Sequence, residues 1–350
     1  MSEASAGRWS VERAAAWADD VGWLVGCNYN PRTASNQLEM WQAETFDPST
    51  IEQELRWSAD LGFNCHRVYL HDLLWEDASA FFARVDRFLG LCERTGHRVI
   101  LTLLDDCWSH ESALGPQPEP LPGVHNARWL QSPAYSVKCR WSEPDRARMR
   151  AYVRGVVERF GRDPRVVLWD LYNEPGNRNT GDARPPADTE FDSAPILRDV
   201  FGWARAAEPM QPLTAGCWRF DPLFAELNAE QRRLSDVLTF HHYGRVEKLP
   251  AVIDTVRGDE PAERPMVCTE YMARTTGNTF ASHLPELKRR GIGAIHWGLV
   301  DGRSQTKFPW GSPEGAPEPD PWHHEVLHPD GSPYRPEEAA LIREVTGHGE

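Results

Sequence analysis

Short apolar runs alternate with longer amphipathic segments along almost the whole 350-residue chain. Repeated strand–helix units are typical of a parallel sheet covered by helices. Eight such units predict one α/β domain over residues 1–350, a (β/α)8 TIM barrel, with a doubly wound open sheet as the alternative. The expected strands are 23–28, 65–70, 98–104, 166–172, 212–217, 237–243, 265–270 and 293–299. The expected helices are 48–61, 78–95, 144–160, 193–207, 222–233, 248–258, 279–290 and 336–346.

Two segments break the rhythm of short connections, 105–143 after the third strand and 300–335 after the eighth. Both are rich in Pro, Gly, His and Trp. In a barrel, the loops that follow the strands stand on the face that carries catalysis. Loops of this length are either functional or disordered, and their aromatic content favours ordered loops that shape a ligand site.

The charge of the chain excludes several kinds of partner. A net charge of −14 and a pI near 5.4 disfavour nucleic acids and anionic membranes, because both require clustered Lys and Arg. No apolar run reaches the length of a membrane span, and the N-terminal residues lack the apolar stretch of a secretory signal. We therefore predict a cytoplasmic protein, with secretion possible if a leader is missing from this sequence.

The seven cysteines are odd in number, scattered, and without C-x-x-C spacing. This pattern fits neither a disulfide framework nor a zinc site, so we interpret them as small buried apolar residues. One catalytic cysteine stays possible, although no motif supports it. The pairs His241-His242 and His323-His324 raise a metal hypothesis, but adjacent residues of a strand point to opposite faces and make poor joint ligands.

Two glutamates follow apolar runs that are expected to be strands. Glu174 belongs to Asn173-Glu174-Pro175 after the fourth run, and Glu270 closes the seventh. Strands four and seven face each other across the mouth of a barrel, so the two side chains are expected to converge. Two carboxyl groups flanking a bond are the machinery of glycoside hydrolysis. A separation of about 5–5.5 Å would indicate retention of configuration and about 6.5–9.5 Å inversion, and the sequence leaves this open.

Asn173-Glu174-Pro175, Glu270 and Trp297 in the eighth run together resemble the cellulase family, glycoside hydrolase family 5 of clan A. The resemblance spans nearly the whole chain. It implies a retaining double displacement that needs no metal and no cofactor. Glu174 would be the general acid/base and Glu270 the nucleophile.

The resemblance also assigns roles to other residues that bind substrate or support the glutamates. Arg67 would lie beside the nucleophile and, with Tyr243, keep Glu270 ionised, while repulsion from Glu270 would raise the pKa of Glu174. Asn173 would bind the sugar 2-hydroxyl, and Trp297 would stack against the sugar. His241 and Tyr243 match the His-x-Tyr of the family and are expected on one face of the sixth strand.

One position departs from the family. A histidine often ends the third strand, where this chain has Leu104-Asp105-Asp106-Cys107-Trp108, so Asp105 or Asp106 would take the sugar-binding place. The sequence does not say which of the two faces inward. Trp41, Trp108, Trp129, Trp218, Trp310 and Trp322 lie in expected loops, and we predict that two or three of them, with Trp108, Trp218 and Trp310 as the candidates, stack against sugar.

The leading hypothesis is a retaining glycosidase acting on a β-linked glycoside or oligosaccharide. A cytoplasmic enzyme would meet imported small substrates, and long loops would shape a pocket for exo-action. An endo-acting β-glucanase or β-mannanase and an exo-enzyme for a furanoside remain alternatives, and so does a barrel that only binds carbohydrate. A metal-dependent amidohydrolase would need His-x-His after the first strand, where the chain reads Gly26-Cys27-Asn28-Tyr29-Asn30. The oligomeric state stays unknown.

Overall fold

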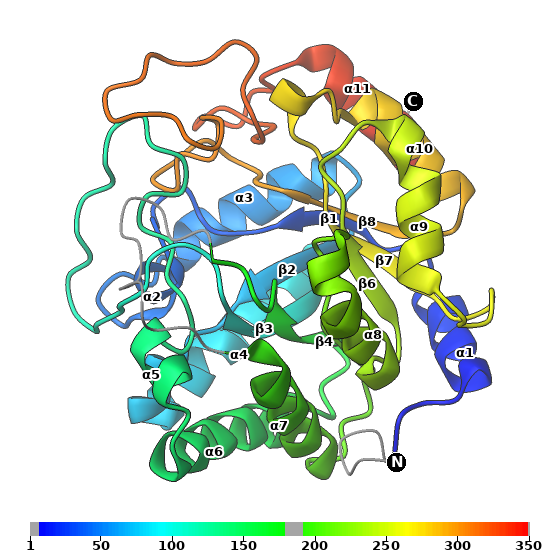
Figure 1. The fold of residues 1–350 in the computed structure, drawn as a ribbon. Coiled ribbons are helices and arrows are strands. Elements are labelled where there is room, and N and C mark those ends of the chain that lie inside the picture. The colour runs from blue at the N-terminus through cyan, green and yellow to red at the C-terminus, as the bar shows by residue number, and fades with distance from the viewer. Residues whose placement is uncertain (1–6, 179–191, 349–350) are drawn as a thin grey trace.

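The computed structural model describes residues 7–178 and 192–348, and one sheet of eight parallel strands lies at its centre (Figure 1). Neighbouring strands pair in the order β5-β4-β3-β2-β1-β8-β7-β6. The pairing of β1 with β8 is that of a barrel, so the (β/α)8 prediction is confirmed and the open doubly wound alternative is wrong. The strands are β1 (Val25–Asn28), β2 (Cys65–Tyr69), β3 (Arg98–Asp105), β4 (Val166–Asn173), β5 (Leu213–Thr214), β6 (Leu238–His241), β7 (Met266–Glu270) and β8 (Gly293–Trp297).

The seam between β5 and β6 is closed by separate hydrogen bonds rather than by a continuous ladder. The amide of Cys217 donates to the carbonyl of Thr239 at 3.0 Å, and the amide of His241 donates to the carbonyl of Cys217 at 2.9 Å. Strand β5 is accordingly shorter than the expected 212–217. Strand β6 ends at His241, so Tyr243 lies beyond the strand in which it was predicted.

Helices cover the outside of the barrel, and each expected helix is present (Figure 1). Asp47 shows how the local sequence sets a boundary, because its side chain accepts a hydrogen bond from the amide of Thr50 and Pro48 is the first helical residue. The sequence did not predict α1, α2 and α5. The helices are α1 (Val11–Val21), α2 (Gln37–Trp41), α3 (Pro48–Asp60), α4 (Ala78–Arg94), α5 (Tyr135–Arg140), α6 (Glu143–Phe160), α7 (Ser193–Ala206), α8 (Ala225–Leu234), α9 (Leu249–Arg257), α10 (Phe280–Arg289) and α11 (Pro336–Thr346), with 3-10 turns at Asp72–Asp77, Pro222–Phe224, Val246–Lys248 and Arg274–Thr276.

The register of the strands brings polar residues together at one end of the barrel. Asn28 pairs with Arg67 on one side and with Trp297 on the other. His241 pairs with Glu270. These positions are the last residues of their strands or close to them, so their side chains form a ring at the carboxyl ends, where barrel enzymes carry their active sites.

The two long loops are ordered and contact each other. In Figure 1 the teal segment after β3 and the orange segment after β8 lie on the same side of the barrel mouth. The amide of Asn126 donates to the carbonyl of Ser304 at 3.0 Å, and that of Gly315 donates to the carbonyl of Pro122 at 2.7 Å. An Nδ1–O distance of 2.6 Å joins His125 to the carbonyl of Phe308. The two loops, called the β3 loop and the β8 loop below, therefore form one continuous wall.

Two further observations bear on the sequence expectations. All seven cysteines are free thiols, as their scattered positions predicted. Among the described residues, no helix combines the length and apolar character that a membrane crossing requires.

Candidate active site

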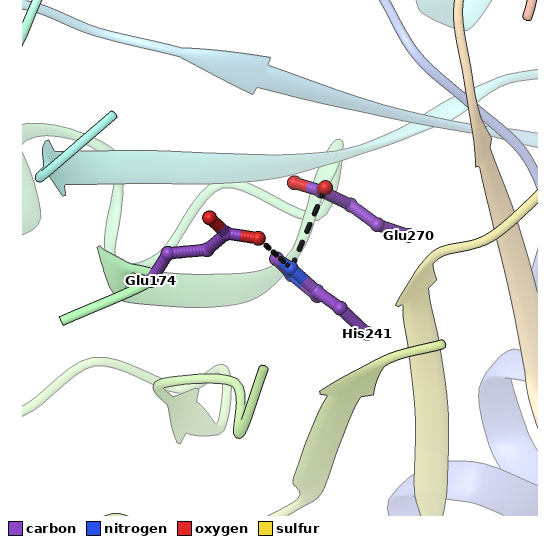
Figure 2. Close-up of side chains that lie close together, drawn as sticks. All are labelled: Glu174, His241 and Glu270. Atoms are coloured by element: carbon purple, nitrogen blue, oxygen red, sulfur yellow. Dashed lines mark hydrogen bonds and ion pairs between the residues drawn. The ribbon is translucent and has the colours of Figure 1, made fainter. Parts of the chain in front are cut away.

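Glu174 and Glu270 converge at the mouth of the barrel, with His241 between them (Figure 2). Nδ1 of His241 lies 2.7 Å from Oε1 of Glu174 and 3.4 Å from Oε2 of Glu270. One oxygen of each glutamate and a ring nitrogen of His241 all lie within 4.8 Å of one another. The side chains of Glu174 and Glu270 are only 11% and 6% exposed. The expected convergence of strands four and seven is therefore present.

Glu174 occupies a strained turn directly after β4. Its φ of +46° lies in the left-handed region, which costs a non-glycine residue about 1 kcal/mol or more. The turn is held because the amide of Gly176 donates to Oδ2 of Asp106 at 2.8 Å and the amide of Asn177 donates to the carbonyl of Glu174 at 2.9 Å. This turn directs the carboxyl of Glu174 towards His241.

The carboxyl of Glu174 is buried in polar contacts. Oε2 accepts hydrogen bonds from the thiol of Cys107 at 3.1 Å and from the side-chain amide of Asn177. Burial raises the pKa of Glu174, and these two hydrogen bonds oppose the rise because they favour the ionised form. A raised pKa suits a group that must carry a proton near neutral pH.

Glu270 is held by three donors, two from β2 and one from the loop after β6. Oε1 accepts from Nη1 of Arg67 at 3.0 Å and from the hydroxyl of Tyr69 at 2.9 Å, and Oε2 accepts from the hydroxyl of Tyr243 at 2.9 Å. Burial nevertheless raises the pKa of Glu270, against the lowering effects of His241, Arg67 and Tyr243. The expectation that these donors lower the pKa of Glu270 holds for their direction only, because desolvation of the carboxylate is larger.

Arg67 is the centre of the network below the two glutamates. It is fully buried, and its guanidinium forms an ion pair with Asp170 of β4 at 2.7 Å. Nη1 also donates to Oδ1 of Asn28 and Nη2 to Oδ1 of Asn173, both at 2.7 Å. A planar guanidinium with five donors can serve several acceptors at once, which lysine cannot. Arg67 thereby fixes Asn173 and Glu270 relative to each other.

Asp105, and not Asp106, faces the catalytic pair. Its carboxyl accepts from the side-chain amide of Asn173 at 2.9 Å and from Nε1 of Trp129 at 2.7 Å, and burial raises its pKa to about 7. Asp106 is turned away and accepts from Lys138 Nζ, the Tyr172 hydroxyl, the Gly176 amide and the Ser193 hydroxyl. The structure therefore assigns the position at the end of the third strand to Asp105, whose carboxyl orients Asn173.

The expected aromatic residues divide into those at the site and those in the core. Trp297 lies with its ring centroid 5.7 Å from Tyr69 and 5.4 Å from Trp129, both edge-on. Trp310, 40% exposed, lies 4.9 Å from Tyr243. Trp108 is half-buried and packs beside the cluster of Tyr69, Cys107 and Trp129, and half-buried Trp218 donates from Nε1 to the carbonyl of Pro175. Trp41, Trp129 and Trp322 are buried at 3% exposure or less.

Three histidines line the wall formed by the β3 and β8 loops. His125 lies with its ring centroid 5.6 Å from His323 and 5.4 Å from His324. The ring centroid of His324 lies 5.6 Å from that of Tyr243, whose hydroxyl donates to Glu270, so this cluster is connected to that glutamate. Burial lowers the pKa of His125 to about 4 and that of His323 to about 3. All three are therefore neutral and present uncharged, polar rings near the site.

Several residues of the site were not recognised from the sequence. Tyr69 lies two residues after Arg67 on β2, so the two-residue period of a strand is a signal that could have found it. Asn28 ends β1, beside the ends of β2 and β8. The partners Asp170, Cys107 and Asn177 carry no comparable signal, whereas Trp129 is one of the six tryptophans expected in loops.

Glu174, His241 and Glu270 are a group of acidic and imidazole side chains close enough to hold a metal ion. A cation there would face the guanidinium of Arg67, which lies 3.0 Å from Oε1 of Glu270. The cation and the guanidinium would then lie against the same buried carboxylate, where like charges repel each other. The donor set therefore fits a proton-transfer pair better than a metal centre.

Comparisons with known proteins identify a family and similar folds for this chain. The sequence model of the cellulase family, glycosyl hydrolase family 5, matches residues 26–298. No curated protein matches the chain. Many solved structures do, among them the exo-beta-1,4-mannosidase Op5Man5 from Opitutaceae bacterium strain TAV5, with a TM-score of 0.60 and 19% identity over 93% of this chain. The chain covers 59% of that mannosidase.

Two further structures have similar folds at low identity. A GH5_18 protein from Streptomyces cattleya, solved with GlcNAc, has a TM-score of 0.61 and 15% identity over 93% of this chain and 80% of its own. The endo-1,4-beta-D-mannanase of Thermotoga petrophila RKU-1 has a TM-score of 0.56 and 16% identity over 93% of this chain and 99% of its own. At these identities the similarity concerns the fold.

Proposed function

Because this chain belongs to the cellulase family, glycosyl hydrolase family 5, we propose that it is a retaining β-glycosidase in which Glu174 is the acid/base and Glu270 the nucleophile. One observation carries the proposal. The two carboxyls have oxygens within 4.8 Å of each other, one bound by Arg67 and two tyrosine hydroxyls and the other by weaker donors. Oxygens this close favour the separation of about 5–5.5 Å that retaining enzymes use over the about 6.5–9.5 Å that leaves room for a water in inversion.

The reaction has two steps with the same two groups. In the first step a carboxylate oxygen of Glu270 attacks the anomeric carbon, the bond to the leaving oxygen breaks, and Glu174 gives its proton to that oxygen. In the second step a water attacks the anomeric carbon, its proton passes to Glu174, and the ester bond to Glu270 breaks. The sugar leaves with its original configuration.

The proton belongs on Glu174 at the start of the cycle. Glu270 faces the fixed positive charge of Arg67 directly, whereas the partners of Glu174 among the described residues are a thiol, an amide and neutral His241. When two nearby carboxyls share one proton, it resides on the one with less positive surroundings. Ionised Glu270 is then ready to attack.

The closed wall on one side of the pair supports exo-action. The sugar stacked on Trp297 would lie beside Trp129 of the β3 loop, and backbone hydrogen bonds join that loop to the β8 loop. An endo-acting enzyme needs a cleft that lets the chain pass on both sides of the scissile bond. On the side of Glu174, by contrast, a groove lined by Asn177, Trp218 and Phe224 is open to solvent and suits the leaving group.

The preferred sugar is proposed from chemistry and from the similar structures together. The wall of neutral histidines and tryptophans would offer hydrogen bonds and stacking to an uncharged sugar, because Tyr243 and Trp310 contact each other and His324 there. Two of the similar structures carry mannosidase or mannanase in their descriptions. β-Mannosides are therefore the first substrates to test, with β-glucosides and furanosides beside them.

We expect the enzyme to release single sugars from the non-reducing end of β-linked manno- or cello-oligosaccharides, with the β-anomer formed first. Proton NMR at early times identifies the anomer that forms first, and chromatography identifies the length of the products. Fragments of intermediate length would instead indicate endo-action, and a first-formed α-anomer would exclude the double displacement. Aryl β-pyranosides and aryl furanosides, compared at equal leaving-group pKa, then identify the sugar.

We also expect turnover to be unchanged by excess EDTA. In the proposed mechanism the guanidinium of Arg67, 3.0 Å from Glu270, supplies the positive charge beside the nucleophile, so no metal ion is needed for that purpose. Rates before and after chelation, followed by addition of zinc or calcium, measure this. Loss of activity that a divalent ion restores would contradict the metal-independent mechanism and would direct attention to the Glu174–His241–Glu270 group.

A further inference from the structure

A thiol group lies against the carboxyl that we assign as acid/base. Cys107 stands two residues beyond the end of β3 and is 7% exposed. Its Sγ donates a hydrogen bond to Oε2 of Glu174 at 3.1 Å. Its backbone amide donates to Oδ1 of Asp105 at 2.8 Å, which fixes the turn that carries the thiol. Cys107 is buried, as expected of the cysteines, but its sulfur makes polar contacts that a purely apolar residue would not make.

The sulfur of Cys107 takes part in a polar network and does not only fill space. The side-chain amide of Asn173 donates to it at 3.3 Å, and that of Asn177 lies 3.5 Å away. Burial, together with the charges of Asp105, Glu174 and Glu270, raises the pKa of the thiol far above its usual value. The group therefore stays protonated and acts as a hydrogen-bond donor to Glu174 while its lone pairs accept from the amides.

The two oxygens of Glu174 have different surroundings. Oε2 is held by Cys107 and Asn177, whereas Oε1 faces Nδ1 of His241 and, across it, Glu270. The oxygen on the side of the nucleophile is therefore Oε1. Donors gathered on Oε2 stabilise the ionised carboxylate and leave the other oxygen to exchange the proton with substrate and water.

We propose that Cys107 is a positioning residue for Glu174, whose S–H hydrogen bond fixes the acid/base and stabilises the carboxylate that forms when the leaving group departs. This inference rests on the proposed function, in which Glu174 gives up a proton in the first step and takes one from water in the second. The thiol keeps its own proton throughout, so no bond to sulfur forms or breaks. The bond strengthens when Glu174 is ionised, because a hydrogen bond to a charged acceptor is stronger than one to a neutral acceptor.

Groups other than Cys107 also influence the pKa of Glu174. Hydrogen bonds to the charged form lower a carboxyl pKa, so removal of the thiol raises the pKa of Glu174. The thiol connects with the Arg67–Glu270 network through Asn173, whose side-chain amide donates to the sulfur and whose Oδ1 accepts from Arg67. Changing the thiol leaves the direct donors of Glu270 in place, because these are Arg67, Tyr69 and Tyr243. The groups whose charges or hydrogen bonds act on Glu174 are Arg67 of β2, Asp106 after β3, Asn177 after β4, His241 of β6, Tyr243 after β6 and Glu270 of β7, of which Asp106 acts through its charge alone.

The pH profile of kcat/KM on an aryl β-glycoside with a poor leaving group tests the inference. The basic limb reports loss of the proton that the acid must donate. We expect Cys107→Ala to move this limb to higher pH by about half to one unit, the size that one net hydrogen bond produces. We expect Cys107→Ser, which keeps a donor, to leave the limb at or below its original pH. Cys92→Ala, which removes a buried thiol of α4, controls for loss of packing.

Either of two results would overturn the inference: a basic limb that Cys107→Ala leaves in place, or a limb that Cys107→Ser moves upward as far as alanine does. Thermal unfolding of each variant checks that the profile belongs to folded enzyme. Glu174→Ala on the same substrate separates this inference from the proposed function. If that variant keeps its rate on poor leaving groups, the acid/base assignment itself fails, and if it loses the rate while Cys107→Ala behaves as the parent, only the role of the thiol fails.

Discussion

Glu270→Ala lowers kcat/KM on aryl β-glycosides by at least about ten-thousand-fold, because no other group can form the glycosyl ester. The fold survives the change, since Arg67 keeps its ion pair with Asp170 and its hydrogen bonds to Asn28 and Asn173. Steady-state rates and thermal unfolding of the variant measure both statements. Glu247→Ala, which removes an exposed glutamate beyond β6, is the matched control and should keep the parental rate.

The same assignment predicts which residue a mechanism-based inactivator labels. A 2-deoxy-2-fluoro β-glycoside with a good leaving group forms the ester bond from its anomeric carbon to a carboxylate oxygen of Glu270, and the fluorine slows its hydrolysis. Peptide mass spectrometry of the trapped enzyme identifies the esterified residue. Label on a different carboxyl, or a Glu270→Ala variant as active as the parent, refutes the nucleophile assignment.

We expect Glu174→Ala to lose more activity on substrates whose leaving group has a higher pKa. Substrates that need protonation lose roughly a thousand-fold, the contribution that general acid catalysis typically makes. Dinitrophenyl glycosides need no proton to depart, so their first step slows far less. Rates across a series of phenols with increasing pKa measure this dependence, and Glu158→Ala on the exposed side of α6 serves as the control.

Azide provides the second measurement on the same variant. The small anion replaces water in the second step and needs no general base, so it restores turnover and yields a β-glycosyl azide of retained configuration. A uniform loss of rate for all leaving groups, without rescue, would mean that Glu174 has a structural role. His241, whose Nδ1 contacts Glu174 at 2.7 Å, would then be the next candidate for the acid.

The positions of Glu174 and Glu270 on the fold were predictable because each depends on local patterns. Buried parallel strands read as short apolar runs, and a carboxylate at the end of such a run stands at the carboxyl edge of the sheet. Eight runs therefore placed Glu174 on the fourth strand and Glu270 on the seventh, on opposite sides of one barrel. The predicted pair is present, with its oxygens within 4.8 Å.

Two expectations about the ends of strands, for Tyr243 and for Asp105 and Asp106, depended on packing that the local sequence does not specify. Tyr243 was expected on β6 beside His241, but the strand ends at His241 because its pairing with β7 is irregular there. Tyr243 still reaches Glu270 from the loop, at 2.9 Å. Asp105 and Asp106 could not be separated, because which of two adjacent side chains turns inward depends on where β3 ends and on the turn that follows it.

By itself, the sequence determined the barrel, the order of its strands and the two glutamates, since the periods of apolar residues and the count of units need no knowledge of distant contacts. The tertiary structure alone decided the surroundings that give those glutamates their chemistry. Asp170 and Tyr69 meet Arg67, Cys107 meets Glu174, and the β3 and β8 loops join into a wall. Apart from Tyr69 and Arg67, which are neighbours on β2, these contacts link residues far apart in the chain, and they form only when loop conformation and burial are settled together for the whole fold.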